Sequence, residues 1–134
     1  MKLNEKIKEH ILSKSVIIAD RRIGIEVECF IYKKNFSRIP VNKSEEYSAI
    51  DLLNELNKIN NDANGTYSLE PGGQIEWSSP PCANMFDLDD ALASYKNLMD
   101  NILSKRNLIS LHIGVEPFTD PDSIELIDQN KYQL

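Results

Sequence analysis

Between residues 22 and 32 the chain alternates between apolar and other side chains, and this pattern constrains the fold more than any other feature of the sequence. A period of two is that of a β-strand, whose successive side chains point to opposite faces. The apolar face of this predicted strand carries Ile23, Ile25, Val27, Cys29 and Ile31. The other face carries Gly24, Glu26, Glu28, Phe30 and Tyr32. We therefore expect one side of the strand to pack against a core while the other presents two carboxylates.

A second pattern predicts a β-hairpin. Two short segments, 66–70 and 74–79, flank a Pro-Gly-Gly connection at 71–73, which is typical of hairpin loops. Strand parity then puts four polar side chains on one face, namely Ser68, Glu70, Gln74 and Glu76. The opposite face is apolar and carries Leu69, Ile75 and Trp77. Gly72 and Gly73 would supply positive φ angles or let the backbone approach a ligand closely.

The remaining periodicity predicts an α+β fold. Apolar residues recur at helical spacing in three segments, 3–13, 45–59 and 87–107. Further extended segments are expected at 15–31, 38–41 and 108–115, and a short last helix at 120–128. This order of elements favours an antiparallel or mixed sheet with flanking helices. A chain of 134 residues is expected to form a single domain.

Composition excludes several classes of partner. The chain has 15 basic and 21 acidic residues and a net charge of −6, which argues against binding nucleic acid or anionic membranes. It has no apolar run near the ~20 residues of a membrane span and no secretory signal at its start, so a cytoplasmic location is expected. Cys29 and Cys82 form no CxxC motif, and reduced thiols are the expected state, although spacing alone leaves a disulfide open.

The carboxylates are the candidates for chemistry. Glu26 and Glu28 lie on one face of their strand, roughly 7 Å apart along it. If both predicted strands belong to one sheet, Glu70 and Glu76 join them on one surface. Such a concentration of negative charge favours Mg²⁺, a hard cation that takes oxygen ligands and often holds substrate phosphates. The alternative is a solvated outer face of an amphipathic sheet. Arg38 could contact phosphate, although a surface ion pair is the commoner role for such a residue.

These motifs also resemble those of a known family, the plant and proteobacterial type of glutamate–cysteine ligase. The opening of that family is matched by residues 24–28, Arg38, Pro40-Val41, Tyr47, Ile50, Leu52-Leu53 and Leu56. Its most distinctive signature resembles residues 69–76, which read Leu-Glu-Pro-Gly-Gly-Gln-Ile-Glu. Downstream similarity lies at Ile113-Gly114-Val115, Pro117 and Lys131-Tyr132. The resemblance covers about residues 18–134 in consistent order.

The resemblance implies a glutamine-synthetase-like catalytic domain whose curved, mainly antiparallel sheet forms the floor of the active site. It implies ATP-dependent ligation of the γ-carboxylate of glutamate to cysteine through an acyl phosphate, giving γ-glutamylcysteine in the first step of glutathione biosynthesis. The family's catalytic domain is longer, so residues 1–134 are expected to be its N-terminal part, to need the C-terminal part as a partner, and to be inactive alone. The substrates would be glutamate, cysteine and ATP, with Mg²⁺ as cofactor.

Residue roles carry over only to matching positions. Four residues are assigned as metal ligands: Glu26, Glu28, Glu70 and Glu76. Three are assigned to substrate binding: Gln74, Gly72 and Gly73. No catalytic residue is assigned. Three other functions stay open, namely another glutamate-activating carboxylate–amine ligase, a non-catalytic metal- or nucleotide-binding module, and a structural domain whose carboxylates are solvated.

Overall fold

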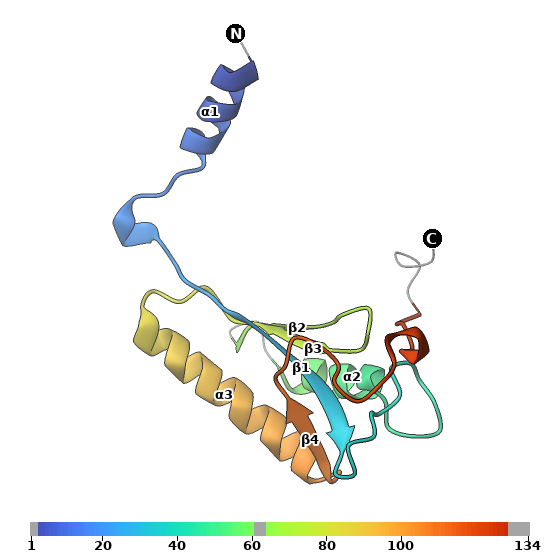
Figure 1. Ribbon diagram of the computed structural model, residues 1–134. Coiled ribbons are helices and arrows are strands. Elements are labelled where there is room, and N and C mark those ends of the chain that lie inside the picture. The colour runs from blue at the N-terminus through green and yellow to red at the C-terminus, as the bar shows by residue number, and fades with distance from the viewer. Residues whose placement is uncertain (1–2, 61–63, 129–134) are drawn as a thin grey trace.

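The chain forms an open four-stranded antiparallel sheet with helices, as a computed structural model of residues 3–60 and 64–128 shows (Figure 1). The helices are α1 (Leu3–Ser13), α2 (Ala49–Ile59) and α3 (Met85–Ser104). The strands are β1 (Glu26–Lys33), β2 (Thr66–Leu69), β3 (Ile75–Ser78) and β4 (Leu108–Leu111). Two 3₁₀ turns, η1 (Ile18–Asp20) and η3 (Pro121–Ser123), complete the described elements. The α+β prediction is therefore confirmed.

The strand order is β2-β3-β1-β4, so β1 and β3 are the inner strands. The β2–β3 hairpin has the predicted register, with Ser68 facing Glu76 and Tyr67 facing Trp77. The same register continues on the other side of β3, where Trp77 faces Val27 and Glu76 faces Glu28. The parity predicted separately for the hairpin and for β1 thus places their apolar side chains on a common face.

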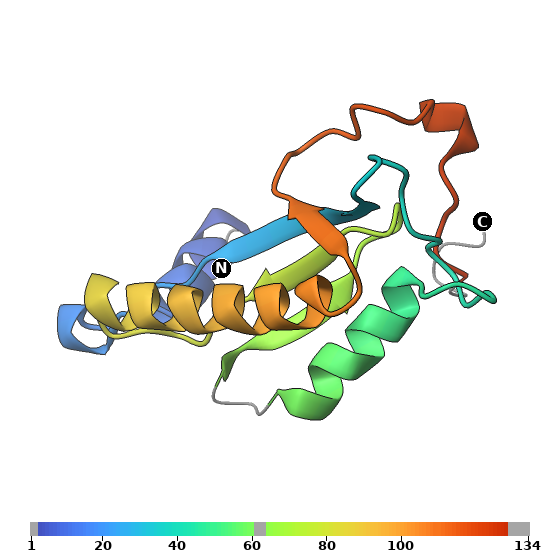
Figure 2. The ribbon, with the colours of Figure 1, turned by 90° about the horizontal axis from the view of Figure 1, so that it is seen from below.

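Helices α2 and α3 cover one face of the sheet, which we call the inner face (Figure 2). The core between them contains the side chains of Cys29, Ile75, Trp77, Leu52 and Met99, all of which are at most 1% exposed. Trp77 stacks on Tyr95 of α3, with ring centroids 4.7 Å apart. Burial of such large apolar surfaces is the main force that holds the sheet to the helices. The opposite, outer face is where the predicted carboxylates lie.

The second half of β1 is buried on both faces. Phe30 and Tyr32 share the parity of Glu28, yet they are only 5% and 0% exposed. The reason is a segment after β4 that crosses the outer face here, where Phe118 packs edge-on against Tyr32 with centroids 5.6 Å apart. Only the first half of β1 therefore presents the exposed carboxylates that the alternating pattern predicts.

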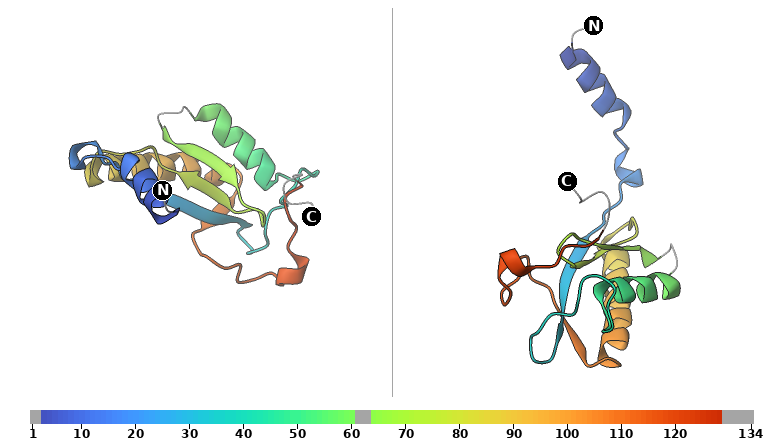
Figure 3. Two further views of the ribbon diagram at one scale, coloured as in Figure 1. Left: turned by 90° about the horizontal axis from the view of Figure 1, so that it is seen from above. Right: turned by 90° about the vertical axis from the view of Figure 1, so that its right-hand side faces the viewer.

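Helix α1 lies apart from the sheet (Figures 1 and 3). Its predicted bounds are confirmed, but none of its residues is buried. The apolar residues Leu3, Ile7, Ile11 and Leu12 are each at least half exposed. No helix in the described part of the chain is long and apolar enough to cross a membrane.

Helix α2 begins later than its periodicity predicts. The expected start near residue 45 is wrong because Ser48 forms the N-cap: its hydroxyl accepts from the Asp51 N–H, and the Asp51 carboxylate accepts from the Ser48 N–H at 3.1 Å. This reciprocal capping box satisfies two of the backbone donors at the helix start. The hydroxyl also donates to the carboxylate at 2.7 Å, and these bonds lower the pKa of Asp51 below 3.8.

The extended segments are shorter than expected. Strand β1 begins at Glu26 rather than near residue 15, and β4 ends at Leu111. Ile113 and Val115, at the end of the segment expected to be extended, are 37% and 78% exposed because the chain leaves the sheet after β4. The helix expected at 120–128 is only the turn η3. Lys131-Tyr132 lies outside the described residues.

Candidate functional site

Glu28 and Glu76 face each other across β1 and β3. They are Cα partners in the antiparallel register, and Ser68 of β2 is the next partner of Glu76. One row across three strands therefore carries two carboxylates and a hydroxyl on the outer face. Ser68 Oγ donates to Glu76 Oε1 at 2.9 Å. Like charges directly opposite each other destabilise a sheet, so this pair has a cost in the folded protein.

The amide of Gln74 joins this row from the hairpin turn. Its Nε2 donates to Glu28 Oε2 at 2.9 Å, which links the start of β3 to β1 by a side-chain contact. The backbone carbonyl of Gln74 accepts from the N–H of Glu70 at 2.9 Å, so the ladder continues beyond the two strands. The predicted neighbours Gln74, Glu28 and Glu76 are thus brought together.

Glu26 and Glu70 extend the outer face in opposite directions. Glu26 pairs with Ser78 at the exposed start of β1. Glu70 directly follows β2, two residues after Ser68. None of the four predicted carboxylates forms an ion pair with another described residue. In the described residues, no group of three or more His, Cys, Asp or Glu side chains is close enough to hold a metal ion.

The donor chemistry nevertheless fits magnesium. The row offers carboxylate, amide and hydroxyl oxygens, which are the ligands of a hard cation. Mg²⁺ commonly uses one or two carboxylates from the protein and completes its shell with water and substrate phosphates. Glu28 and Glu76 provide two such carboxylates on one exposed surface, with Glu26 and Glu70 on the same face.

The hairpin turn has a conformation that requires glycine at one position. Gly73 has φ +81°, and a Cβ there would lie 2.6 Å from Val41 Cγ2 and 3.2 Å from an Arg38 Nη2. Gly72 has no positive φ, and a Cβ there would meet only Ile124 at 3.7 Å. Of the two turn glycines expected to have positive φ or to approach a ligand closely, Gly73 alone has a positive φ. The atoms that crowd it belong to Val41 and Arg38 of the protein, and not to a ligand.

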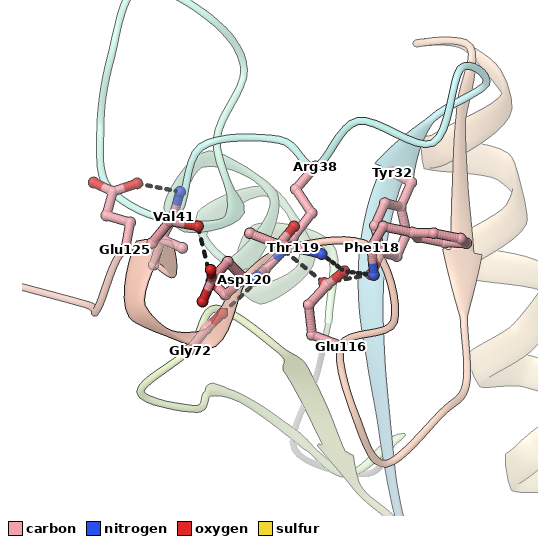
Figure 4. Close-up of polar contacts among 10 residues, drawn as sticks. Tyr32, Arg38, Val41, Gly72, Glu116, Phe118, Thr119, Asp120 and Glu125 are labelled. Atoms are coloured by element: carbon pink, nitrogen blue, oxygen red, sulfur yellow. Dashed lines mark hydrogen bonds and ion pairs between the residues drawn. The ribbon is translucent and has the colours of Figure 1, made fainter.

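A buried ion pair lies beside this turn (Figure 4). Arg38 Nε is 3.3 Å from Glu116 Oε2, and the two side chains are 12% and 3% exposed. Glu116 also accepts from the Tyr32 hydroxyl and from the N–H groups of Phe118 and Thr119, the latter two at 2.9 Å and 3.2 Å. Burial, together with the bond to Glu116, raises the pKa of Tyr32 well above its ordinary value. Arg38 is therefore part of a buried network rather than a surface ion pair.

Residues 116–128, which we call the C-terminal strap, connect to the same region. Glu125 accepts from the Val41 N–H at 2.9 Å and from Asn42 Nδ2 at 2.8 Å. Burial opposes ionisation of this carboxyl, but the hydrogen bonds prevail and lower the pKa of Glu125. The buried Ile127 donates its N–H to the Pro71 carbonyl at 2.8 Å. The strap thus reaches both the loop after β1 and the hairpin turn.

Both cysteines are buried in the structure. Cys29 and Cys82 are free and buried, so no disulfide joins them. Burial raises the pKa of the Cys29 thiol to about 11, although its contact with the Tyr95 hydroxyl acts in the other direction. Because a thiolate is the reactive form, Cys29 serves as a small core residue, as its position on the apolar face predicts.

Sequence reasoning missed the strap. Glu116, Glu125 and Ile127 belong to no periodic pattern, and their partners lie far away along the chain. The one available signal was Arg38, which the sequence suggested could contact phosphate or form a surface ion pair, without identifying its partner.

Comparison with known proteins identifies the family of this sequence. The family model described as "Glutamate-cysteine ligase family 2(GCS2)" matches residues 22–134. This range includes β1, the hairpin and the C-terminal strap. No curated protein matches the chain. The resemblance drawn from residues 24–28 and 69–76 is therefore confirmed at the level of the family.

Proposed function

This chain belongs to glutamate-cysteine ligase family 2, and we propose that the outer face of its sheet is the metal- and phosphate-binding wall of an ATP-dependent carboxylate–amine ligase. The observation that carries this proposal is the facing pair Glu28 and Glu76, with Gln74 bonded to Glu28. The pair is on the solvent side of a sheet whose other face is fully used by the core. A cation between the two carboxylates would offset their repulsion.

In this proposal Glu28 and Glu76 hold Mg²⁺, with Glu26 and Glu70 as further oxygen donors on the same face. The ion would neutralise charge on the phosphates of ATP and orient them. Ligation of this kind depends on positioning and charge stabilisation more than on a general base, since phosphoryl transfer leaves little covalent chemistry to the protein. Gln74 would orient the carboxylate of Glu28. The turn at 71–73 would lie at the edge of the proposed metal- and phosphate-binding surface.

The finer assignment follows from the family. We propose that the γ-carboxylate of glutamate is activated as an acyl phosphate and that the amine of cysteine then displaces phosphate. The product would be γ-glutamylcysteine, formed in the cytoplasm as the first step of glutathione biosynthesis. The residues that contact the amine would distinguish this ligase from another glutamate-activating ligase. We assign no residue of the chain to that role.

Calorimetric titration of the 134-residue chain with Mg²⁺, in the presence and absence of ATP, tests the proposed wall. We expect weak Mg²⁺ binding that ATP strengthens, and at least about a fivefold loss of Mg²⁺ affinity in Glu28→Gln and in Glu76→Gln, because each change removes one charged ligand. Asp89→Asn is the matched control, since it removes an exposed carboxylate from α3 instead.

The outcomes separate the candidate functions. Loss of binding in the two glutamate variants but not in Asp89→Asn supports the metal site. Equal affinity in all four proteins, or no heat with either ligand in the wild type, contradicts it and favours a structural domain. Phosphate release with glutamate and cysteine present would identify a ligase. Its absence is expected of residues 1–134 alone, so it would not by itself favour a module that binds ATP without turnover.

A further inference from the structure

We propose that Arg38 and Glu116 are positioning residues that hold the hairpin turn at 71–73, and through it keep the Gln74 amide on Glu28. This inference rests on the proposed function, because the row that it positions is the proposed metal wall. Arg38 and Glu116 lie outside the row formed by Glu28, Glu76 and Ser68, so the proposal extends the site beyond the sheet. The argument starts from the contacts of the Arg38 guanidinium.

The guanidinium of Arg38 is held from three sides. Its Nε faces Glu116, its Nη2 donates to the carbonyl of Gly72, and its Cζ lies over the Phe30 ring, 4.9 Å from the ring centroid. The planar guanidinium has N–H donors in several fixed directions, so it can bind Glu116 and the Gly72 carbonyl at once. The compact ammonium of a lysine could not reach both partners together. Arg38 therefore joins β1, the hairpin turn and the C-terminal strap at one point.

Glu116 fixes the orientation of that guanidinium. Its carboxylate is nearly fully buried and accepts from Tyr32 and from two backbone N–H groups of its own strap. A buried carboxylate with this many donors stays in one orientation. The Nη2 of Arg38 is consequently aimed at the Gly72 carbonyl rather than free to rotate (Figure 4).

The turn depends on these donors because its carbonyls point away from the ladder. The Glu70 carbonyl accepts from the Gly73 N–H at 2.8 Å, and that of Pro71 accepts from Ile127 in the strap. The third carbonyl in succession, that of Gly72, is held by Arg38. Three consecutive carbonyls are thus fixed by the turn itself, the strap and Arg38. The next residue is Gln74, whose amide reaches Glu28.

A positioning role and a purely structural role predict different responses. Loss of a general stabilising contact would make every N–H of the sheet exchange faster to the same degree, through global unfolding. Loss of a positioning contact would open the turn selectively. Two N–H groups report on this difference: that of Gly73, bonded to Glu70, and that of Ser79, bonded to Ile25 at the other end of β3.

The test is hydrogen exchange by NMR on the 134-residue chain, with Arg38→Lys as the main variant because it keeps the buried charge. Glu116→Gln is the second variant, since it keeps the acceptor oxygen but removes the charge that orients Arg38. Lys33→Met is the control, because the Lys33–Glu46 pair is shorter, at 2.7 Å, but its side chains are 41% and 61% exposed and the pair includes no residue of the turn. The side-chain amide signals of Gln74 are recorded in each protein.

We expect the exchange rate of Gly73 relative to Ser79 to rise about tenfold in Arg38→Lys and Glu116→Gln, and to stay constant in Lys33→Met. The Gln74 amide signals should move toward those of a solvated glutamine in the first two variants only. An unchanged ratio, or equal acceleration of both N–H groups, would overturn the inference. Neither readout uses a metal, so a failure here is distinct from failure of Glu28→Gln to weaken Mg²⁺ binding.

Discussion

Glu28 and Glu76 are Cα partners on neighbouring antiparallel strands, and both side chains lie on the outer face of the sheet. No cation of the described residues lies between them. The repulsion between facing carboxylates is unfavourable for folding, and it is the same feature that would make the pair receptive to a divalent ion. Stability and binding should therefore respond in opposite directions to removal of one charge.

We accordingly expect Glu28→Gln and Glu76→Gln to stabilise the metal-free protein by up to about 1 kcal/mol. Glutamine keeps the acceptor oxygen used by Gln74 or Ser68, so only the charge is lost. Urea unfolding in the presence of EDTA measures the effect. A clear loss of stability in both variants would show that the two carboxylates do not repel each other in the folded state.

The two turn glycines should respond differently to the same substitution. Gly73→Ala introduces a Cβ at φ +81° and 2.6 Å from Val41 Cγ2, so we expect a loss of about 1–3 kcal/mol. Gly72→Ala places a Cβ 3.7 Å from Ile124 Cγ2, an ordinary van der Waals contact, and should change stability by less than about 1 kcal/mol. Denaturant unfolding of the pair gives the comparison, and equal effects would mean that the positive φ of Gly73 carries no special cost.

The capping box of α2 should make stability depend on pH. The bond from Ser48 holds the pKa of Asp51 below its ordinary 3.8, so the ionised carboxylate favours the folded state. Its contribution is complete above the unfolded pKa of 3.8 and is lost as the pH falls through the lower folded value. We expect Asp51→Asn, which removes a negative charge from the first turn of the helix, to cost about 0.3–1 kcal/mol near neutral pH.

The same comparison at low pH provides the control. Below both pKa values the wild-type carboxyl is protonated, so the unfolding free energies of wild type and Asp51→Asn should converge. Chemical unfolding at about pH 7 and about pH 2 measures this difference. A gap that is the same at both pH values would exclude the charged form of Asp51 as the source of the stabilisation.

The hairpin and β1 were predictable because local rules determine them. The Pro-Gly-Gly connection sets the register, and parity then determines that Glu76 lies outward while Trp77 enters the core. The pairing of Glu28 with Glu76 was predicted only as a convergence that depended on both strands sharing a sheet. The observed register of β1 on β3 shows which carboxylates converge, because it pairs Glu28 with Glu76.

The contacts around Arg38 could not be predicted in the same way. Glu116 and Ile127 reach the turn through a strap without periodicity, so no local pattern identifies their partners. Burial of Phe30 and Tyr32 was missed for the same reason, since a strand pattern shows which side chains share a face but not what covers that face. Helix α2 differs again: its periodic residues were found, but the start was set by the Ser48 cap.

Paramagnetic broadening by Mn²⁺, a substitute for Mg²⁺, tests the proposed wall most directly because it locates the ion without requiring turnover. In ¹H–¹⁵N spectra of the 134-residue chain, the first signals to broaden should be the N–H groups of Glu28 and Glu76 and the side-chain amide of Gln74. Excess Mg²⁺ should restore them, and Glu28→Gln should weaken the effect. Broadening that begins instead at the acidic residues of α3, such as Asp89 and Asp90, would contradict the assignment of the metal to the outer face of the sheet.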